Sequence, residues 1–374
     1  MSSRIDDYIN GRNEERKKEN NFRSLKPASA LIDFTSNDYL GFARDPELKK
    51  RVAAELLHYP DYSLGSTGSR LLTGNSAYAE ELESMLANFH HADTALIFNS
   101  GFTANYGLLS SLPYRGDTVI YDELVHASVH DGIRHGKADK VPFLHNNLAD
   151  LEQKLSAAKG LKYVVVESLY SMDGDFAPLQ EIAALCEKFE AGLIVDEAHA
   201  NGLYGKDGSG LANQAGIEDK CLARIYTFGK AIGSCGAAVV CAQPLKEFLL
   251  NYCRPFIFST ALPFTNLAVI KCAYGYLSNV QNRREYLIKL AVSFKKAMRE
   301  ANFSVVGSSG PIQSIVLKGN DKVKALAEKV RQKGFDVRPI LYPTVPKGTE
   351  RIRVCLHSFN TEQEVNELAK AFVI

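Results

Sequence analysis

The sequence predicts an α/β fold with a mostly parallel, mixed central sheet and a smaller C-terminal α+β domain. From about residue 45, short apolar segments rich in β-branched residues alternate with longer amphipathic segments. This alternation is typical of buried parallel strands connected by helices. Near residue 264 it gives way to long helical patterns and a few strands. The two patterns together indicate a large α/β domain followed by a small one.

The predicted strands of the large domain are short and apolar throughout, as expected for strands buried on both faces. The last two are joined by a short glycine-rich segment, so we expect them to form a hairpin that makes the sheet mixed. The strands are predicted at Ala95–Phe98, Thr118–Tyr121, Tyr163–Val166, Leu193–Val195, Arg224–Phe228 and Ala237–Cys241.

Amphipathic periodicity places helices between these strands and in the C-terminal block. In the large domain it is clearest at Ala77–Phe89 and Leu179–Phe189. The C-terminal block has predicted strands at Ser314–Leu317 and Arg351–Leu356. Its predicted helices are Leu267–Val280, Tyr286–Ala301, Lys322–Lys333 and Thr361–Phe372.

The domain boundaries follow from these changes in pattern. Residues 1–30 are polar and charged with weak helical periodicity, and we assign an N-terminal arm to residues 1–44. The large domain then covers residues 45–263, and the small domain covers residues 264–374.

Composition argues against several classes of protein. The 44 Lys+Arg and 43 Asp+Glu residues leave a net charge of +1, whereas a nucleic-acid binder carries a basic excess. No stretch approaches the length of apolar sequence that spans a membrane, and the first residues lack the apolar core of a signal peptide. The seven scattered cysteines form no CxxC motif, which indicates reduced thiols in the cytoplasm rather than disulfides or a metal site.

Polar residues stand directly after several of the predicted strands. Because ligands of open α/β sheets bind beyond the carboxyl ends of the strands, we expect these residues to line a site. They are Ser100 and Gly101, Glu167 and Ser171, Asp196 and His199, His126, and Lys230.

Lys230 is the most informative of these residues. It lies between Gly229 and Ala231, and such small neighbours suit an amine that forms a Schiff base with a cofactor. An acid, a histidine and a helix start that can bind phosphate complete the set of groups that pyridoxal 5′-phosphate needs. Taken singly, Ser100-Gly101 is equally typical of a plain helix cap, Asp196 of a salt bridge and His199 of a structural histidine.

Competing motifs are absent or weak. The sequence contains no GxxxxGK[ST], HExxH or GxSxG motif, which argues against a P-loop, a zinc protease and a serine hydrolase. The glycine-rich Gly205–Gly210 lacks the strand and helix of a dinucleotide site. His90 and His91 end an amphipathic helix, and we expect both to be exposed.

Over nearly its whole length the sequence resembles the α-oxoamine synthases, a branch of the fold-type I (aspartate aminotransferase-like) pyridoxal-phosphate enzymes. The resemblance rests on the order and spacing of several short motifs. They are Thr35–Gly41, Gly65–Arg70, Asn99–Phe102, His126–Ser128, Ser171–Asp175, Asp196–His199, Thr227–Lys230, Phe258–Thr260 and Pro343–Pro346.

The resemblance implies a role for each matching residue. Lys230 would carry the cofactor and shuttle protons, Asp196 would pair with the ring nitrogen, and His126 would stack on the ring. The remaining contacts to the cofactor would come from Ser100, Gly101, Phe102, Glu167, Ser171, His199 and Thr227, with Ser259 and Thr260 reaching the phosphate of a neighbouring subunit in a homodimer. The substrate positions would be Arg23, Asn37, Ser69, His126, Thr344 and Arg353, of which Arg353 would bind the amino-acid carboxylate.

The resemblance also implies the reaction, a condensation of L-alanine with a pimeloyl thioester that releases carbon dioxide and gives 8-amino-7-oxononanoate. The thioester would be carried by coenzyme A or by acyl carrier protein. Other branches remain open: glycine C-acetyltransferase, 5-aminolevulinate synthase, serine palmitoyltransferase and autoinducer synthase. So do a non-catalytic regulatory subunit and an NAD-dependent dehydrogenase.

Two segments depart from wording frequent in the biotin branch of the family. Asp196–Asn201 reads Asp-Glu-Ala-His-Ala-Asn where Asp-Asp-Ala-His-Gly-Thr is frequent, and Gly233–Gly236 reads Gly-Ser-Cys-Gly where Val-Ser-Gly is frequent. We expect these departures to bear on the acyl substrate rather than on the cofactor.

Overall fold

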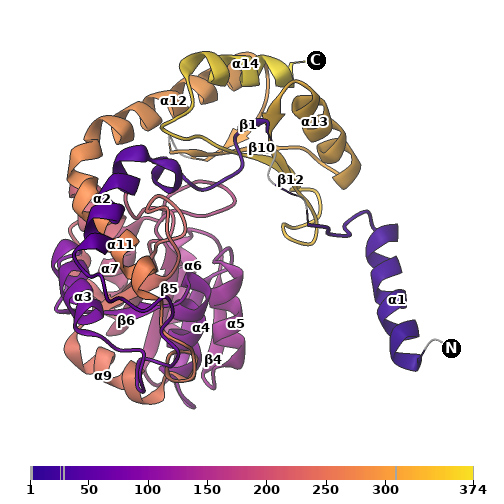
Figure 1. Ribbon diagram of the computed structural model, residues 1–374. Helices are drawn as coiled ribbons and strands as arrows, with labels where there is room; N and C mark the ends of the chain where they lie inside the picture. The colour runs from indigo at the N-terminus through magenta and orange to yellow at the C-terminus, as the bar shows by residue number, and fades with distance from the viewer. Residues whose placement is uncertain (1–2, 26, 28–29, 308–309, 374) are drawn as a thin grey trace. The chain divides into compact units, whose positions relative to one another are not determined.

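The structure is a computed structural model that describes residues 3–25, 27, 30–307 and 310–373 (Figure 1). The chain divides into two compact units. The larger comprises Asn37–Ser171 and Asp175–Glu285, and the smaller comprises Met1–Ser36, Met172–Gly174 and Tyr286–Ile374. The sequence-based boundaries at residues 45 and 264 stay a prediction.

A seven-stranded sheet with the order β2-β8-β7-β6-β5-β3-β4 forms the centre of the larger unit. Only β8 runs against its neighbours, because it pairs antiparallel with both β2 and β7. The predicted mixed sheet and its hairpin are therefore confirmed. The strands are β2 (Thr94–Phe98), β3 (Thr118–Asp122), β4 (Asp139–Phe143), β5 (Lys162–Glu167), β6 (Ala191–Asp196), β7 (Cys221–Thr227) and β8 (Ala237–Cys241).

Within this seven-stranded sheet, the edge strand β4 is the one that the sequence did not predict. Its residues are mostly exposed, so it lacks the continuous apolar pattern of its neighbours. It also contains Pro142, which an edge strand tolerates because one side of its backbone needs no ladder partner.

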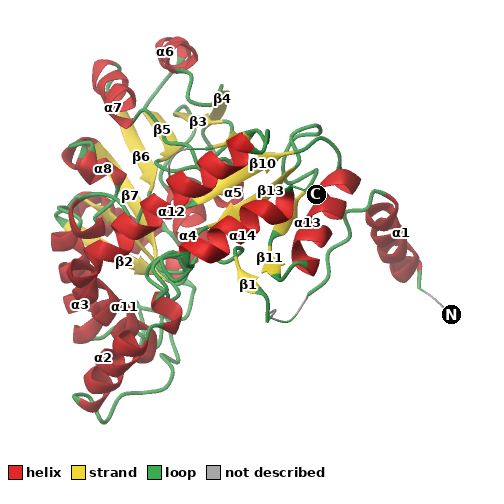
Figure 2. Ribbon diagram, turned by 90° about the horizontal axis from the view of Figure 1, so that it is seen from above, coloured by secondary structure: helices red, strands yellow, loops and turns green. Residues whose placement is uncertain are grey.

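Helices pack around this sheet in the larger unit (Figure 2). Several begin at side-chain caps, as at Ser76 of α3, Ser100 of α4 and Asn147 of α6, whose side chains accept main-chain N–H groups. The helices are α2 (Pro46–Leu57), α3 (Ala77–Phe89), α4 (Gly101–Ser111), α5 (Ala127–His135), α6 (Leu148–Ala157), α7 (Leu179–Lys188), α8 (Leu211–Gln214), α9 (Gln243–Tyr252), α10 (Arg254–Ile257) and α11 (Phe264–Leu277).

The smaller unit contains an antiparallel sheet of order β12-β13-β10-β9 and a separate parallel pair of β1 and β11. Helix α1 (Arg4–Lys18) lies in the segment predicted as an arm, begins at a capping box of Ser3 and Asp6, and buries none of its residues. The other elements are β1 (Ile32–Asp33), β9 (Val305–Val306), β10 (Ile312–Val316), α13 (Asn320–Gln332), β11 (Phe335–Asp336), β12 (Arg338–Ile340), β13 (Arg351–Cys355) and α14 (Glu362–Phe372), with α12 (Gln281–Glu300) leading into the unit.

Among the described residues, no helix combines the length and apolar character that crossing a membrane requires.

Candidate active site

A cavity of about 280 Å³ in the larger unit brings many of the predicted site residues together. This volume is close to the lower end of the range for small-molecule sites, about 300–1,000 Å³. The cavity lies where β2, β5, β6 and β7 end, as expected for an open α/β sheet. The predicted residues that line it are Asn37, Ser100, Gly101, Phe102, His126, Glu167, Asp196, His199, Thr227 and Lys230.

Asp196 ends β6 and is 4% exposed, so its charge needs compensating donors. Its Oδ1 accepts a hydrogen bond from the main-chain N–H of Ala198 at 2.9 Å, and its Oδ2 accepts one from Asn105 Nδ2 at 2.7 Å. These donors satisfy the buried carboxyl oxygens and hold the side chain at the wall of the cavity.

His126 caps helix α5 and is oriented by Ser128. The ring Nδ1 lies 2.8 Å from Ser128 Oγ and accepts from the Ser128 main-chain N–H at 3.2 Å. An Nδ1 that accepts from a main-chain N–H carries no proton, so this contact assigns the remaining proton to Nε2 and makes the ring neutral. Burial is the main cause that lowers the pKa of His126, and Lys230 adds to it while Asp196 opposes it.

Asn105 connects these two residues, and the sequence did not predict its role. Its Nδ2 donates to Asp196 and also to Ser128 Oγ, at 3.1 Å. Asp196, Asn105, Ser128 and His126 therefore form one continuous hydrogen-bond chain. The available signal was the spacing of Asn105 from Gly101, since residues four apart share one face of a helix.

Lys230 lies in a turn after β7, and its Nζ donates to Thr227 Oγ1 at 3.4 Å. Helix α4 begins beside this turn at Gly101. A Cβ atom added to Gly101 would lie 2.4 Å from Thr227 Cγ2, so a side chain at position 101 would fill the space at the helix start. The free N–H groups of that first turn suit a phosphate.

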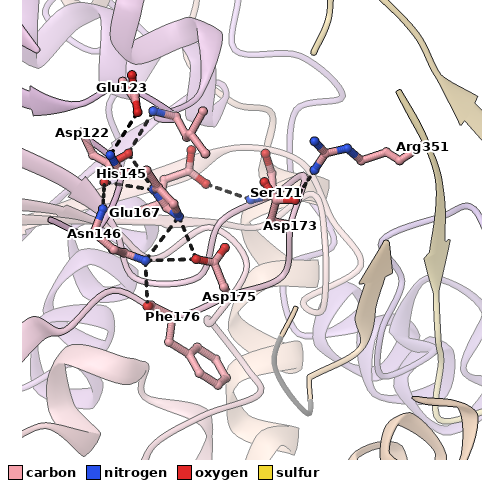
Figure 3. Close-up of polar contacts among 11 residues, drawn as sticks. Asp122, Glu123, His145, Asn146, Glu167, Ser171, Asp173, Asp175, Phe176 and Arg351 are labelled. Atoms are coloured by element: carbon pink, nitrogen blue, oxygen red, sulfur yellow. Dashed lines mark hydrogen bonds and ion pairs between the residues drawn. The ribbon is translucent and has the colours of Figure 1, made fainter. Parts of the chain in front are cut away.

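Glu167 ends β5, directly beside Asp196 in the register of the sheet. Its Oε2 accepts from the main-chain N–H of Ser171 at 3.2 Å (Figure 3). Burial, followed by the negative charge of Asp196, raises the pKa of Glu167 well above its ordinary value. Of these two neighbouring acids, Asp196 is the one that accepts hydrogen bonds from both Ala198 N and Asn105 Nδ2.

His199 reaches the same cavity and contacts Tyr39, another residue that the sequence did not predict. Its Nδ1 lies 2.7 Å from Tyr39 Oη, and Tyr39 Oη donates to Asn37 Oδ1 at 3.2 Å. The contact joins residues 160 positions apart in the chain, which explains why no local pattern indicated it.

The remaining predicted residues do not line this cavity, and they include Ser171, which contacts the lining residue Glu167 through its main-chain N–H. In the larger unit, Ser69 pairs with Thr260 in an isolated bridge, and Ser259 lines a separate small cavity. In the smaller unit, Arg23 Nη2 donates to Thr344 Oγ1 at 3.3 Å, and Arg353 lies in β13 opposite Ser314. The roles of these residues, and of those that line the cavity, stay predictions.

The expectation that His90 is exposed is wrong. The ring is fully buried and stacks on Tyr226 with the ring centres 3.5 Å apart. Both of its nitrogens have partners, Ser209 O and Tyr274 Oη, each at 3.0 Å. These partners satisfy the polar atoms and make burial possible, whereas His91 is exposed as expected.

Two residues of the departing segment Asp196–Asn201 have structural contacts outside the cavity. Glu197 accepts from the main-chain N–H groups of Leu211 and Ala212 at the start of α8. Asn201 donates to Thr227 O and to Tyr274 Oη. In the second segment that differs from the biotin-branch wording, Gly233–Gly236, Cys235 has a substituted side chain that lines the cavity.

The residues present fit pyridoxal phosphate. An amine, a carboxylate with its own donors, a neutral histidine and an open helix start face one cavity, and these are the groups that this cofactor requires. In the part of the chain that the structure describes, no group of three or more His, Cys, Asp or Glu residues could hold a metal ion.

Comparisons with known proteins agree with this geometry. Residues 29–372 match the family model of class I and II aminotransferases. The chain is 40% identical to 8-amino-7-oxononanoate synthase of Emericella nidulans, with 91% of this chain and 88% of that protein covered. It is also 40% identical to the synthase of the same name from Haemophilus ducreyi, with 90% of each chain covered.

Solved structures show the same fold. Serine palmitoyltransferase from S. paucimobilis, with a bound PLP–myriocin aldimine, matches with a TM-score of 0.89 and 27% identity, covering 98% of this chain and 96% of that one. The 8-amino-7-oxononanoate synthase of Francisella tularensis matches with a TM-score of 0.78 and 28% identity, covering 92% and 97%. These matches confirm the predicted fold-type I architecture.

Proposed function

The chain belongs to the class I and II aminotransferase family, and from this premise we propose that it condenses L-alanine with a pimeloyl thioester. The products are 8-amino-7-oxononanoate, carbon dioxide and the free thiol of the acyl carrier. One observation carries the proposal: Lys230, Asp196 and His126 meet in one cavity, in a chain whose relatives at 40% identity bear the name of that synthase.

Pyridoxal phosphate, when bound, supplies an electron sink for the α-carbon of the amino acid. Lys230 Nζ would hold the cofactor, then remove and return the proton at that carbon. Asp196 accepts hydrogen bonds from two donors, and as a carboxylate it would keep the ring nitrogen protonated. The first-turn amides of α4 and the hydroxyl of Thr227 would bind the phosphate.

His126 would act on the acyl substrate. Because Nδ1 is occupied by Ser128, the proton on Nε2 is the one that His126 can donate. A neutral N–H donor can stabilise the negative charge that develops on the thioester oxygen without adding a fixed charge beside Lys230. Asn105 and Ser128 would hold this donor in place.

The overall reaction balances without an oxidant or reductant. A bond forms between the α-carbon of alanine and the thioester carbonyl carbon, and the carbon–sulfur bond breaks to release a thiolate, which takes up one proton from solvent to give the free thiol. The bond to the alanine carboxylate breaks to release carbon dioxide. Arg353 would bind that carboxylate, with Arg23, Asn37, Ser69 and Thr344 at the substrate positions and coenzyme A or acyl carrier protein as the carrier.

A second copy of the chain completes the proposal. A groove of about 670 Å³ in the larger unit is lined by residues that include Tyr59, Tyr62 and Phe264, and Leu64 in the same segment is 82% exposed. Tyr59 and Leu64 are the exposed apolar side chains of this surface, and exposed apolar patches are typical of an interface. We assign this surface to a homodimer in which Ser259 and Thr260 reach the neighbouring subunit's phosphate.

We also propose a cytoplasmic location, which the absence of disulfides among the seven cysteines, all within the described residues, supports.

A substrate panel tests the proposal. L-alanine, glycine and L-serine are each combined with pimeloyl-, acetyl-, succinyl- and palmitoyl-coenzyme A, and carbon dioxide release is measured. We expect L-alanine with the pimeloyl thioester to give the highest kcat/KM. Highest activity with L-serine and the palmitoyl thioester would instead favour the serine palmitoyltransferase reaction, the candidate that the TM-score of 0.89 supports.

A further inference from the structure

We propose that His145 is a positioning residue that fixes the hairpin arms Ser168–Ser171 and Asp175–Ala177, and thereby sets Ser171 against Glu167 at the wall of the cofactor cavity (Figure 3). The catalytic consequence rests on the proposed function, whereas the structural part does not.

His145 bridges two carboxylates with its ring. Nδ1 lies 2.9 Å from Oδ1 of Asp122, the buried last residue of β3, and Nε2 lies 2.7 Å from Asp175 Oδ2. An ionised carboxylate has no proton to donate, so it can only accept hydrogen bonds. With both carboxylates ionised, both ring nitrogens must carry protons to make both contacts. A cationic ring between two ionised carboxylates satisfies this geometry and gives strong, charge-assisted bonds.

The surroundings of the ring keep this charge. Burial alone would lower the pKa of His145, but hydrogen bonds and charge from Asp122 and Asp175 outweigh it and raise the pKa to about 10. Glu123, which follows β3, accepts from the His145 main-chain N–H at 3.1 Å. Tyr170 of the first hairpin arm packs edge-on against the ring, with centres 4.5 Å apart.

Asn146 strengthens the same connection. Its main-chain N–H donates to Asp122 Oδ2 at 2.9 Å, and its Nδ2 donates to Asp175 Oδ2 at 3.0 Å and to Phe176 O at 3.2 Å. Asp175 and Phe176 both belong to the second hairpin arm. His145 and Asn146 therefore join that arm to the end of β3.

The second arm in turn holds the first. Tyr170 N donates to Asp175 O at 3.0 Å, and Ala177 N donates to Ser168 O at 3.1 Å. The first arm begins directly after Glu167 and ends at Ser171, whose N–H donates back to the Glu167 carboxyl. A displacement of Asp175 would therefore change the relation of Ser171 to Glu167, which lines the cavity.

Two substitutions of His145 separate the two contacts of its ring. An asparagine amide can occupy the place of Nδ1 and keep the contact to Asp122, whereas a glutamine amide can reach the place of Nε2 and keep the contact to Asp175. His135→Asn is the matched control, because His135 is exposed at the end of α5 and contacts only Asp131 O among the described hydrogen-bond partners of its ring.

The first measurement is hydrogen exchange of the Tyr170 and Ala177 amides in the cofactor-free chain. The second is the Kd for pyridoxal phosphate, from the visible absorbance of the bound cofactor. We expect His145→Asn to accelerate exchange and raise the Kd, each by about tenfold, as for the loss of one hydrogen bond to a charged group. We expect His145→Gln to remain within about threefold of the parent chain, since it keeps the Asp175 contact, and His135→Asn to change neither quantity.

Each other outcome overturns a defined part of the inference. Unchanged exchange in His145→Asn would show that the ring does not hold the hairpin. Faster exchange with an unchanged Kd would show that the hairpin does not position the cofactor site. Equal defects in His145→Asn and His145→Gln would contradict the role of Asp175. If the parent chain bound no pyridoxal phosphate, the proposed function would fail, and exchange alone would decide the structural part.

Discussion

Replacing Asn105 tests how the site holds the carboxyl group of Asp196. Asn105 is 3% exposed and donates both to Asp196 and to Ser128 Oγ. Asn105→Ala removes the donor of the 2.7 Å contact to Asp196 Oδ2 and interrupts the chain to His126. The change therefore removes one of the two hydrogen bonds that hold the Asp196 carboxyl group. It also removes the support that Ser128 Oγ receives on the side away from His126.

The size of the effect follows from the kind of contact that is lost. A hydrogen bond to a charged group contributes about 1.5–3 kcal/mol, and each 1.4 kcal/mol corresponds to about tenfold in an equilibrium constant. We therefore expect the Kd for pyridoxal phosphate to rise by about 10- to 100-fold. Ala198 N still donates to Oδ1, so binding should be weakened rather than abolished.

The assay is a titration of cofactor-free protein, followed by the visible absorbance of the bound cofactor. Asn251→Ala is the control, because Asn251 is exposed and donates to Glu247 O in a surface helix. A Kd for Asn105→Ala within about twofold of the parent value, well below the loss of one such bond, would refute the role assigned to the hydrogen-bond chain.

Three further changes test separate features. Gly101→Ala should weaken cofactor binding in the same titration, because its Cβ would lie 2.4 Å from Thr227 Cγ2; normal binding would contradict the cradle at the start of α4. Gly275→Ala, with nothing within 4 Å of its Cβ in α11, should raise the free energy of unfolding by about 0.5–1 kcal/mol in denaturant melts, and destabilisation would show that the position is crowded. Asp122 and Asp175 raise the pKa of His145 to about 10 from an ordinary value of 6.5, so its contribution to stability is full below about pH 6.5 and is lost as the pH rises to about 10. The free energy of unfolding, measured across this range, should therefore decline less steeply in His145→Asn than in the parent chain. An equally steep decline in both would contradict the cationic bridge.

Much of the fold was predictable because buried parallel strands carry a continuous apolar pattern. β8 has the predicted bounds, Ala237–Cys241, and β2 begins only one residue earlier than predicted. The main cavity residues were predictable for a related reason, since the sheet brings the ends of its strands to one edge. Lys230 and Asp196 are such residues.

The rest depends on contacts between distant parts of the chain. His145 lies in a polar segment, and its partners Asp122 and Asp175 are 23 and 30 residues away. His90 was predicted to be exposed because it ends an amphipathic helix, and the prediction failed because its partner Tyr274 is 184 residues away in the sequence. Polar residues of this kind become buried only when such a partner is supplied, and periodicity carries no information about that partner.

The substitutions in Asp196–Asn201 are a related case. In sequence they stand beside the proposed catalytic Asp196, and from this position they were predicted to bear on the acyl substrate. In the structure, Glu197 holds the start of α8 and Asn201 supports the main chain of Thr227. Along this turn, residues that line the cavity therefore alternate with residues that make structural contacts outside it. Among the substituted side chains, Cys235 is the one that lines the cavity.

The most direct test of the central claim is a coupled measurement of carbon dioxide and free thiol. The protein, loaded with pyridoxal phosphate, is given pimeloyl-coenzyme A and L-alanine labelled at its carboxylate. We expect labelled carbon dioxide and thiol to appear in equal amounts, only with both substrates present, and not with Lys230→Ala. Thiol release without labelled carbon dioxide, or full turnover by Lys230→Ala, would contradict the account.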